Sequence, residues 1–162
     1  METDVDQRLS LGVDEVHVWM VAIDQIEPRD VATYQTIMSA EEMERNQRYR
    51  FEKSRFADCI TRALVRTVLS KYATLEPAAW QFEKGEHGKP EVTNSPTPLR
   101  FNLSHSSSYI VCAVTPSYDL GIDIENVERG NDVLAIADRY FSAIELVDLF
   151  ELSGVKDKTD RF

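Results

Sequence analysis

The segment FADCITRALVRTVLSKY, residues 56–72, has an apolar side chain at every fourth position. These positions form one continuous stripe on a helix and are Phe56, Ile60, Leu64, Val68 and Tyr72. Such a stripe is typical of a helix that packs on a core rather than of a cofactor-binding surface. The helical pattern reaches back to Ser39, which pairs with Glu42 in a predicted capping box. We therefore expect residues 39–72 to be helical and to supply much of the core.

Short strands are expected on both sides of this helical region. The apolar, β-branched run at residues 16–23 predicts a buried strand before it. After Pro77, glycines and prolines divide the chain into further predicted strands, with residues 91–98 as a loop. These strands are expected at residues 80–83, 101–103, 109–114 and 120–125. Helices combined with antiparallel strands predict an α+β fold.

A second helical stretch is expected near the end of the chain. One face of a helix would be shared by Val133, Ile136, Ala137 and Tyr140. A second capping box, formed by Ser142 and Glu145, is expected to open another helix at residues 143–152.

Composition argues against several classes of partner. The 162 residues carry a net charge of −10, so no overall positive field attracts nucleic acid or an anionic membrane surface. The acidic residues 1–6 do not resemble a leader, and the apolar run at residues 18–23 is too short to cross a bilayer, so we expect a cytoplasmic protein. Cys59 and Cys112 have neither zinc-site spacing nor a disulfide framework, and we interpret both as buried thiols.

The segment LGIDIE, residues 120–125, brings two acids together. Strand alternation sends its aliphatic side chains to one side and Asp123 and Glu125 to the other, roughly 7 Å apart. Neighbouring carboxylates repel each other, and a hard divalent cation such as Mg²⁺ relieves that repulsion. The alternative interpretation is a half-exposed edge strand with solvated acids.

The segment FNLSHSSS, residues 101–108, ends a predicted strand in hydroxyl groups around one histidine. Hydroxyl donors, a protonatable ring and the amides of a turn together suit an anion. A catalytic pair of Ser104 and His105 is a competing interpretation, but adjacent residues on a strand point to opposite faces. A serine turn that caps the strand is an equally good alternative.

The segment GEHGKP, residues 85–90, holds Lys89 in a turn between glycine and proline. The only dense cationic stretch of the chain lies upstream and consists of Arg45, Arg48, Arg50, Lys53 and Arg55. Phosphate is the ligand that such groups favour. The alternative is a solvated helix face whose charges pair with acids.

In their order along the chain, GKP at residues 88–90, FNLSHS at 101–106 and GIDIE at 121–125 closely resemble the three successive motifs of the Sfp-type 4'-phosphopantetheinyl transferases. Residues 48–66 resemble the first long helices of that family, and residues 138–142 with Glu145 resemble the helix that follows its metal-binding strand, so the likeness covers essentially the whole chain. The resemblance implies two similar α/β lobes with the site between them. One complete lobe would occupy residues 1–117, and the start of a second, pseudo-symmetric lobe residues 118–162.

The resemblance also implies a reaction. A serine of an acyl or peptidyl carrier protein, from fatty acid, polyketide or nonribosomal peptide biosynthesis, would attack the β-phosphate of coenzyme A and receive 4'-phosphopantetheine. Asp123 and Glu125 match the acids that hold Mg²⁺, or alternatively Mn²⁺, against the pyrophosphate. Together with His105 they are the catalytic candidates.

Other positions match contacts to coenzyme A. Lys89, Ser104 and His105 match residues that contact the nucleotide and its phosphates. Arg45 lies where the family has a basic residue near the 3'-phosphate. Glu42 departs from the pattern, because some members have a lysine there.

The family pattern continues into a Trp-x-x-Lys-Glu motif that supplies a further metal ligand and a phosphate-contacting lysine. The only tryptophans here are Trp19 and Trp80, so the motif is missing from these 162 residues and their own transfer activity is expected to be impaired. A non-catalytic remnant or fragment that binds coenzyme A or metal is the alternative. Self-association, as in the shorter trimeric holo-carrier-protein synthases, is a third way to complete the site.

Overall fold

The structure is a computed structural model that describes residues 8–85, 88–126, 137–154 and 157–158. It divides into two compact units, residues 1–124 and 125–162. All strands among the described residues, and the longest helix, belong to the first unit. Helices and antiparallel strands occur together there, so the expected α+β fold is confirmed. The division into two similar lobes stays a prediction.

The helical region expected at residues 39–72 forms two helices, α2 (Ala40–Gln47) and α3 (Glu52–Ser70). The chain leaves the helical conformation at Phe51, which has φ −99° and ψ 136° and precedes the first residue of α3. Asn46 joins the two helices, because its Nδ2 donates to the Arg55 carbonyl and to Asp58 Oδ2, both at 2.8 Å. The turn between the helices is therefore fixed by an amide that satisfies two acceptors.

The capping box predicted at the start of α2 is confirmed. The Glu42 amide donates to the Ser39 hydroxyl at 3.2 Å, and the Ser39 amide donates to Glu42 Oε2 at 2.9 Å. Three short helices that we did not expect precede it: η1 (Ile23–Gln25), η2 (Pro28–Asp30) and α1 (Val31–Gln35). A proline at the first position of η2 suits a helix start, where its missing N–H costs nothing.

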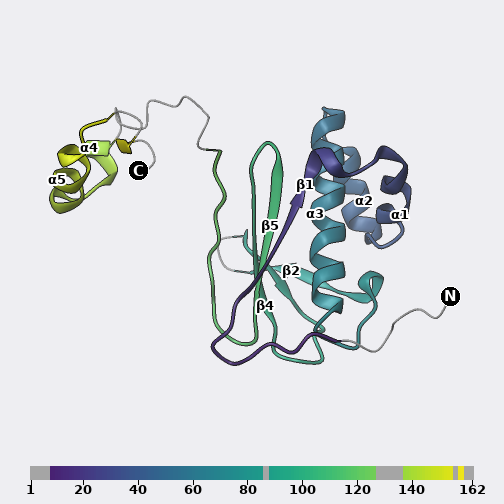
Figure 1. The fold of residues 1–162 in the computed structure, drawn as a ribbon. Helices are drawn as coiled ribbons and strands as arrows, with labels where there is room; N and C mark the ends of the chain where they lie inside the picture. The colour runs from purple at the N-terminus through teal and green to yellow at the C-terminus, as the bar shows by residue number, and fades with distance from the viewer. Residues whose placement is uncertain (1–7, 86–87, 127–136, 155–156, 159–162) are drawn as a thin grey trace. The chain divides into compact units, whose positions relative to one another are not determined.

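Helix α3 carries the core of the first unit. Ile60, Val68 and Tyr72 of the predicted stripe are buried, and Phe56 and Leu64 are partly buried, so the stripe is confirmed as core. In Figure 1, α3 lies between the sheet and the shorter helices α1 and α2. This position explains why its apolar side chains are covered on more than one side.

The main sheet has the order β1-β5-β4 and is antiparallel throughout. Its strands are β1 (His17–Ala22), β4 (Arg100–His105) and β5 (Tyr109–Thr115). Cys112 of the central strand pairs with Trp19 on one side and Leu103 on the other. These three side chains lie on the face that packs against α3, in the same hydrophobic cluster as Leu69.

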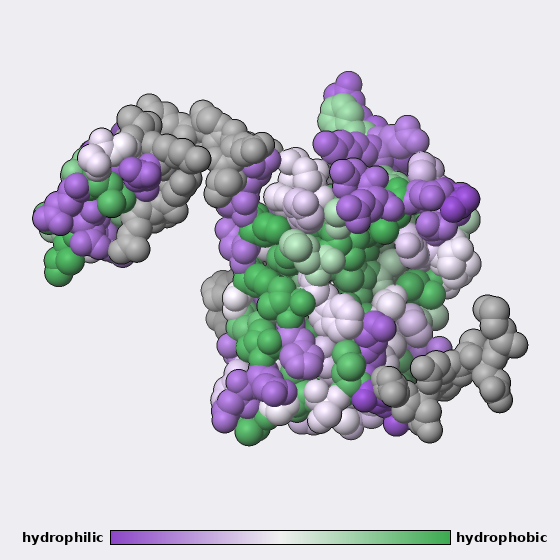
Figure 2. Space-filling view, in the orientation of Figure 1, coloured by the Kyte–Doolittle hydropathy of each residue, from purple (hydrophilic) through white to green (hydrophobic). Residues whose placement is uncertain are grey.

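Strand β1 corrects one prediction. It was expected to be buried, but it lies at an edge of the sheet, and Val18 and Met20 are 59% and 62% exposed. These two side chains alternate with Trp19, so they lie on the sheet face that α3 does not cover. In Figure 2, hydrophobic residues reach the surface over the strands, whereas hydrophilic residues surround the upper end of α3.

A small second sheet replaces part of an expected loop. It pairs β2 (Phe82–Lys84) with β3 (Pro90–Val92), whereas residues 91–98 were predicted to be a loop and the preceding strand was placed at 80–83. Between the two strands, Gly88 has a φ of 79°, which favours glycine. The turn is closed because the Gly85 amide donates to the Lys89 carbonyl at 2.8 Å. The short 3-10 helix η3 (Pro77–Ala79) precedes this sheet.

The predicted strand at residues 120–125 is not formed. This stretch has no ladder partner among the described residues, and a strand requires one. Exposure nevertheless alternates as predicted: Leu120, Ile122 and Ile124 are half-buried, while Asp123 and Glu125 are exposed.

The second unit contains α4 (Ala137–Tyr140) and α5 (Ala143–Glu151). The capping box of Ser142 and Glu145 is confirmed, and the Ser142 amide, which donates to the Glu145 carboxylate at 2.8 Å, lowers the pKa of that acid. Val133 and Ile136 lie outside the described residues. Tyr140 is 76% exposed whereas Ala137 is fully buried, so these two do not share a buried face.

Both cysteines are free and buried, as predicted. Burial raises the pKa of the Cys112 thiol from 9.0 to about 12. Burial, with a smaller contribution from the nearby Asp58 charge, also raises the pKa of Cys59. Separately, the described residues include no helix that combines the length and apolarity needed to cross a membrane.

Candidate functional site

The second and third motifs meet at a serine and an acid. Ser104, near the end of β4, donates its hydroxyl proton to Asp123 Oδ1 at 2.6 Å and accepts the Ile124 amide at 3.2 Å. The hydroxyl thus donates once and accepts once, and both bonds go to the segment that follows β5. Ser104 therefore orients the Asp123 carboxylate, and its proton is not shared with the adjacent His105.

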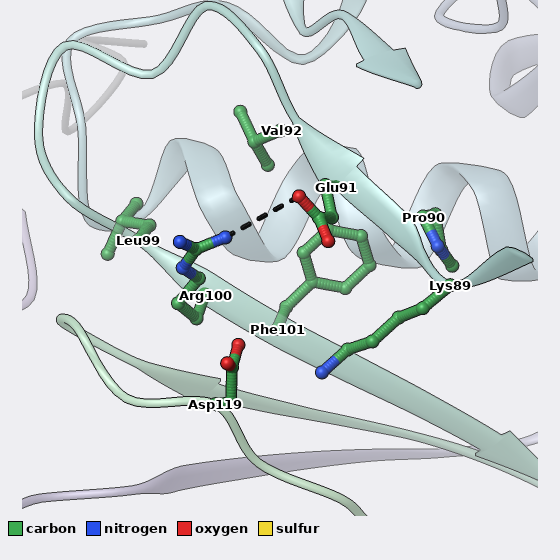
Figure 3. A pocket seen from close by; sticks show the side chains of 8 residues that line it. All are labelled: Lys89, Pro90, Glu91, Val92, Leu99, Arg100, Phe101 and Asp119. Carbon is green, nitrogen blue, oxygen red and sulfur yellow. Dashed lines mark ion pairs between the residues drawn. The ribbon is translucent and has the colours of Figure 1, made fainter. Parts of the chain in front are cut away.

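The first motif reaches the same segment through Lys89. Its Nζ donates to the Leu120 carbonyl at 3.0 Å. Figure 3 shows Lys89 and Asp119 reaching toward one gap from opposite sides, with the Arg100–Glu91 ion pair, 3.7 Å long, nearby. This pocket has a volume of only about 10 Å³, enough for one water molecule at most. In this arrangement, Lys89 fixes the backbone of the third motif.

A larger depression, which we call the Arg45 pocket, lies among α2, α3 and β2 and has a volume of about 790 Å³. The cationic residues that line it are Arg45, Arg62, Arg66 and Lys84. Glu41 and Glu83 also line it and are exposed to solvent.

Glu42, also at the edge of the Arg45 pocket, does not act there as a free acid. Its Oε2 accepts Arg66 Nη2 at 2.8 Å and Nε at 3.2 Å, and the two side chains are 8% and 2% exposed. Arg66 also donates to the carbonyls of Pro77 and Trp80. The acid that stands where some relatives were expected to have lysine is therefore part of a buried structural ion pair.

A third depression, the His105 pocket, lies between the start of α3 and the hairpin that joins β4 to β5. Its volume is about 390 Å³, and its polar wall contains Lys53, Asp58, Arg62, His105 and Ser106. This composition offers cations and a hydroxyl, with one acid among them.

The predicted site residues are thus brought together only in part. Asp123 and Ser104 are in contact, whereas Arg45, Lys89 and His105 each line a different pocket. Glu125 is exposed and belongs to the second unit. Within the described part of the chain, no group of three or more His, Cys, Asp or Glu side chains is arranged to hold a metal ion. The roles assigned to these residues stay predictions.

Arg62 lines both the Arg45 and the His105 pockets but was not among the predicted site residues. A signal was available, because Arg62 and Arg66 lie one turn apart within the most apolar part of a predicted helix. Asp58, four residues before Arg62, is at ion-pair spacing. Charged residues at such positions need partners, and those partners become visible only in three dimensions.

Known proteins resemble this chain at the level of sequence. A family model described as the N-terminal part of 4'-phosphopantetheinyl transferase matches residues 25–117. The 4'-phosphopantetheinyl transferase HetI of Nostoc sp. is 33% identical over 138 residues, which cover 83% of this chain and 57% of that protein. A 4'-phosphopantetheinyl transferase of Bacillus subtilis is 39% identical over 125 residues, which cover 77% of this chain and 54% of that protein. The 4'-phosphopantetheinyl transferase Sfp of B. subtilis strain 168 is 32% identical over 128 residues, which cover 79% of this chain and 54% of that protein. The chain thus spans about half the length of these relatives.

Proposed function

Because this chain belongs to the 4'-phosphopantetheinyl transferase family, we propose that the protein transfers 4'-phosphopantetheine from coenzyme A to a serine of an acyl or peptidyl carrier protein. The serine oxygen forms a bond to the β-phosphorus of the coenzyme A pyrophosphate. The bond from that phosphorus to the bridging oxygen breaks, and 3',5'-adenosine bisphosphate leaves with the electron pair. The serine proton passes to a base or to water.

Asp123 and Glu125 are the residues that we propose to hold Mg²⁺. A carboxylate oxygen is a ligand that this ion prefers, and the Asp123 carboxylate is exposed and oriented by the Ser104 hydroxyl at 2.6 Å. The ion would neutralise the charge that develops on the pyrophosphate. Two carboxylates leave the coordination shell of Mg²⁺ incomplete, so phosphate oxygens, water or a further protein ligand must complete it.

The observation that carries this proposal is the junction of the three motifs. Lys89 and Ser104, which are distant in sequence, both bond to the segment that holds Asp123. A motif that served only as a surface strand would not require two other motifs to fix its backbone. Residues 25–117, matched by the family model, include both Lys89 and Ser104.

The experiment is an apo-to-holo assay. A purified apo carrier protein is incubated with coenzyme A and MgCl₂, and mass spectrometry follows the gain of one phosphopantetheine. The assay uses these 162 residues and, in parallel, a chain extended to the length of the relatives. We expect transfer by the longer chain and at least about a hundredfold less by the shorter one, because several charge-stabilising groups of the site act together.

Two variants test the role of Asp123 in this assay. Asp123→Ala in the active chain should lower the rate by about a hundredfold or more, whereas Asp24→Ala, which removes an exposed acid from η1, should leave it unchanged. Equal rates for both variants would refute the role of Asp123. Coenzyme A binding without transfer to any carrier protein would favour the non-catalytic alternative.

A further inference from the structure

The turn that joins α2 to α3, residues 48–51, exposes all of its side chains, and we call it the α2–α3 turn. It consists of Arg48, Tyr49, Arg50 and Phe51. The aromatic side chains of Tyr49 and Phe51 are 40% and 65% exposed. The guanidinium carbon of Arg50 lies 5.5 Å from the centre of the Phe51 ring. Arginine and aromatic residues are enriched where proteins bind one another, so this turn has the composition of an interface.

The charge of this region is opposite to that of the chain as a whole. Residues 45–55 hold five basic side chains and one acid, within a chain whose net charge is −10. Arg48 pairs with Glu44, but neither Arg50 nor Lys53 forms an ion pair with any residue that the structure describes. On a solvated helix face, charges pair with acids three or four residues away, and here they do so only in part. The unpaired basic groups therefore attract an acidic partner, which the rest of the chain repels.

The α2–α3 turn is held in one conformation by its own hydrogen bonds. Arg55 Nη1 donates to the Tyr49 carbonyl at 2.9 Å, and the Tyr49 amide donates to the Asn46 carbonyl at 3.2 Å. The amides of Ser54 and Arg55 both donate to the Phe51 carbonyl at 3.1 Å. A surface that is already ordered loses little conformational entropy when a partner binds. The turn can therefore bind a partner without being ordered first.

The α2–α3 turn borders the candidate site. Tyr49 and Lys53 line the His105 pocket together with His105 itself. The residue before His105 is Ser104, whose hydroxyl donates to Asp123 at 2.6 Å. In Figure 1 the turn lies at the upper end of α3, and Figure 2 shows this end projecting beyond the surface around it. A partner bound to the turn would thus lie beside residues that we propose to act in transfer.

We infer that the α2–α3 turn is a docking surface for an acidic segment of the carrier protein. Arg50 and Lys53 face the carboxylates of that segment, and Phe51 contacts an apolar side chain beside them. The inference rests on the proposed function, because the carrier protein is the protein substrate of that reaction. It adds the surface of the first unit that binds the carrier and the charge that the carrier must present. Because the rest of this chain is acidic, the basic turn also fixes the orientation in which the carrier binds.

The test measures steady-state transfer by the chain extended to the length of the relatives, with carrier protein and coenzyme A varied in turn. Arg50→Glu should raise the KM for the carrier about tenfold, because it places like charges opposite each other. The kcat and the KM for coenzyme A should change less than about twofold, because Arg50 lines neither the Arg45 pocket nor the His105 pocket. Phe51→Ala should raise the carrier KM about fivefold, as loss of an aromatic interface contact does.

The matched control is Arg8→Glu, which makes the same change of charge at another exposed arginine. The neighbouring Leu9 amide donates to the Lys71 carbonyl at 2.7 Å, so Arg8 lies near the far end of α3, a helix of 19 residues or roughly 28 Å. Its loss should change the carrier KM less than about twofold, because salt screens charges at that separation.

Two further measurements test the charge itself. A synthetic peptide copied from the most acidic segment of the carrier should inhibit transfer, whereas the same peptide with its acids changed to amides should not. Raising the NaCl concentration should lower kcat/KM for the carrier in the unchanged protein more than in Arg50→Glu. Urea unfolding of each variant shows whether the folded state is retained, and Arg50→Gln provides the comparison if Arg50→Glu is unstable.

A carrier KM that Arg50→Glu leaves unchanged would overturn this inference while leaving the proposed function standing. An equal rise in Arg8→Glu would also overturn it, because the effect would then come from net charge and not from the turn. Inhibition by both peptides alike would show that the contact does not depend on acidic groups. Failure of the unchanged extended chain to transfer phosphopantetheine would overturn the inference and the proposed function together.

Discussion

Removing the Glu42 carboxylate should destabilise the first unit more than any exposed charge change on the same helix. In Glu42→Ala, the Arg66 guanidinium loses the one acid that it pairs with among the described residues, at 2.8 and 3.2 Å, and its charge stays buried. The Ser39 amide loses its capping acceptor at the same time. The ion pair lies between two side chains that solvent barely reaches.

The size of the effect follows from these contacts. Breaking a buried ion pair by removing one partner typically costs about 3–5 kcal/mol, and loss of a cap about 1 kcal/mol. Arg66 keeps the Pro77 and Trp80 carbonyls, at 3.0 and 2.8 Å, and lies 5.1 Å from the centre of the Phe82 ring. These contacts partly solvate the charge, so we expect a total loss of about 3–4 kcal/mol in the free energy of unfolding.

The assay is urea unfolding followed by circular dichroism, with m-values compared to confirm that the transition is unchanged. Ser39→Ala removes the other bond of the capping box, from the Glu42 amide to the Ser39 hydroxyl, and should cost about 1 kcal/mol without touching the ion pair. Glu44→Ala breaks the exposed pair with Arg48 and should cost less than about 1 kcal/mol. Combining Glu42→Leu with Arg66→Met should recover much of the loss, because no buried charge remains. If Glu42→Ala cost no more than Glu44→Ala, the buried pair would not stabilise the fold.

Two further predictions concern the sheet. Burial raises the pKa of the Cys112 thiol from its ordinary value of 9.0 to about 12 in the folded protein. As the pH rises above about 9, the unfolded chain therefore loses this proton first, and the free energy of unfolding should fall. Cys112→Ala should flatten this dependence in urea titrations, and an unchanged slope would contradict the assignment. Ser104→Ala removes the acceptor of the Ile124 amide, so hydrogen exchange at that amide should accelerate while exchange at Cys112 does not. Equal rates at Ile124 in both proteins would contradict the role of Ser104.

Features set by neighbouring residues were predicted well from the sequence. Both capping boxes need only residues three positions apart, and both are present. The stripe on α3 follows from helical periodicity, and it is core. The burial of β1, by contrast, was predicted wrongly. The apolar residues Val18 and Met20 indicate a strand, but whether anything covers them depends on distant parts of the fold.

The contacts within the candidate site also depend on distant parts of the fold. Motif order along the chain identified Lys89, Ser104 and Asp123 and associated them with one function. It did not reveal that Lys89 bonds to a backbone carbonyl or that Ser104 orients Asp123, because these contacts depend on where the segment after β5 lies in three dimensions. Arg62 was overlooked because its place in the lining of two pockets depends on packing, which spacing alone does not contain.

The strand order β1-β5-β4 also determines how long β1 must wait for its partner strand during synthesis on the ribosome. His17 pairs with Val114, so β1 leaves the ribosome roughly a hundred residues before its partner exists. At about 5–20 residues per second, that interval lasts on the order of 5–20 s. Helix α3 emerges within it and can shield the Trp19 side of β1, but the backbone edge of β1 that pairs with β5 stays unpaired. A nascent chain stalled before Tyr109 should therefore recruit chaperones, and release should coincide with the appearance of β5.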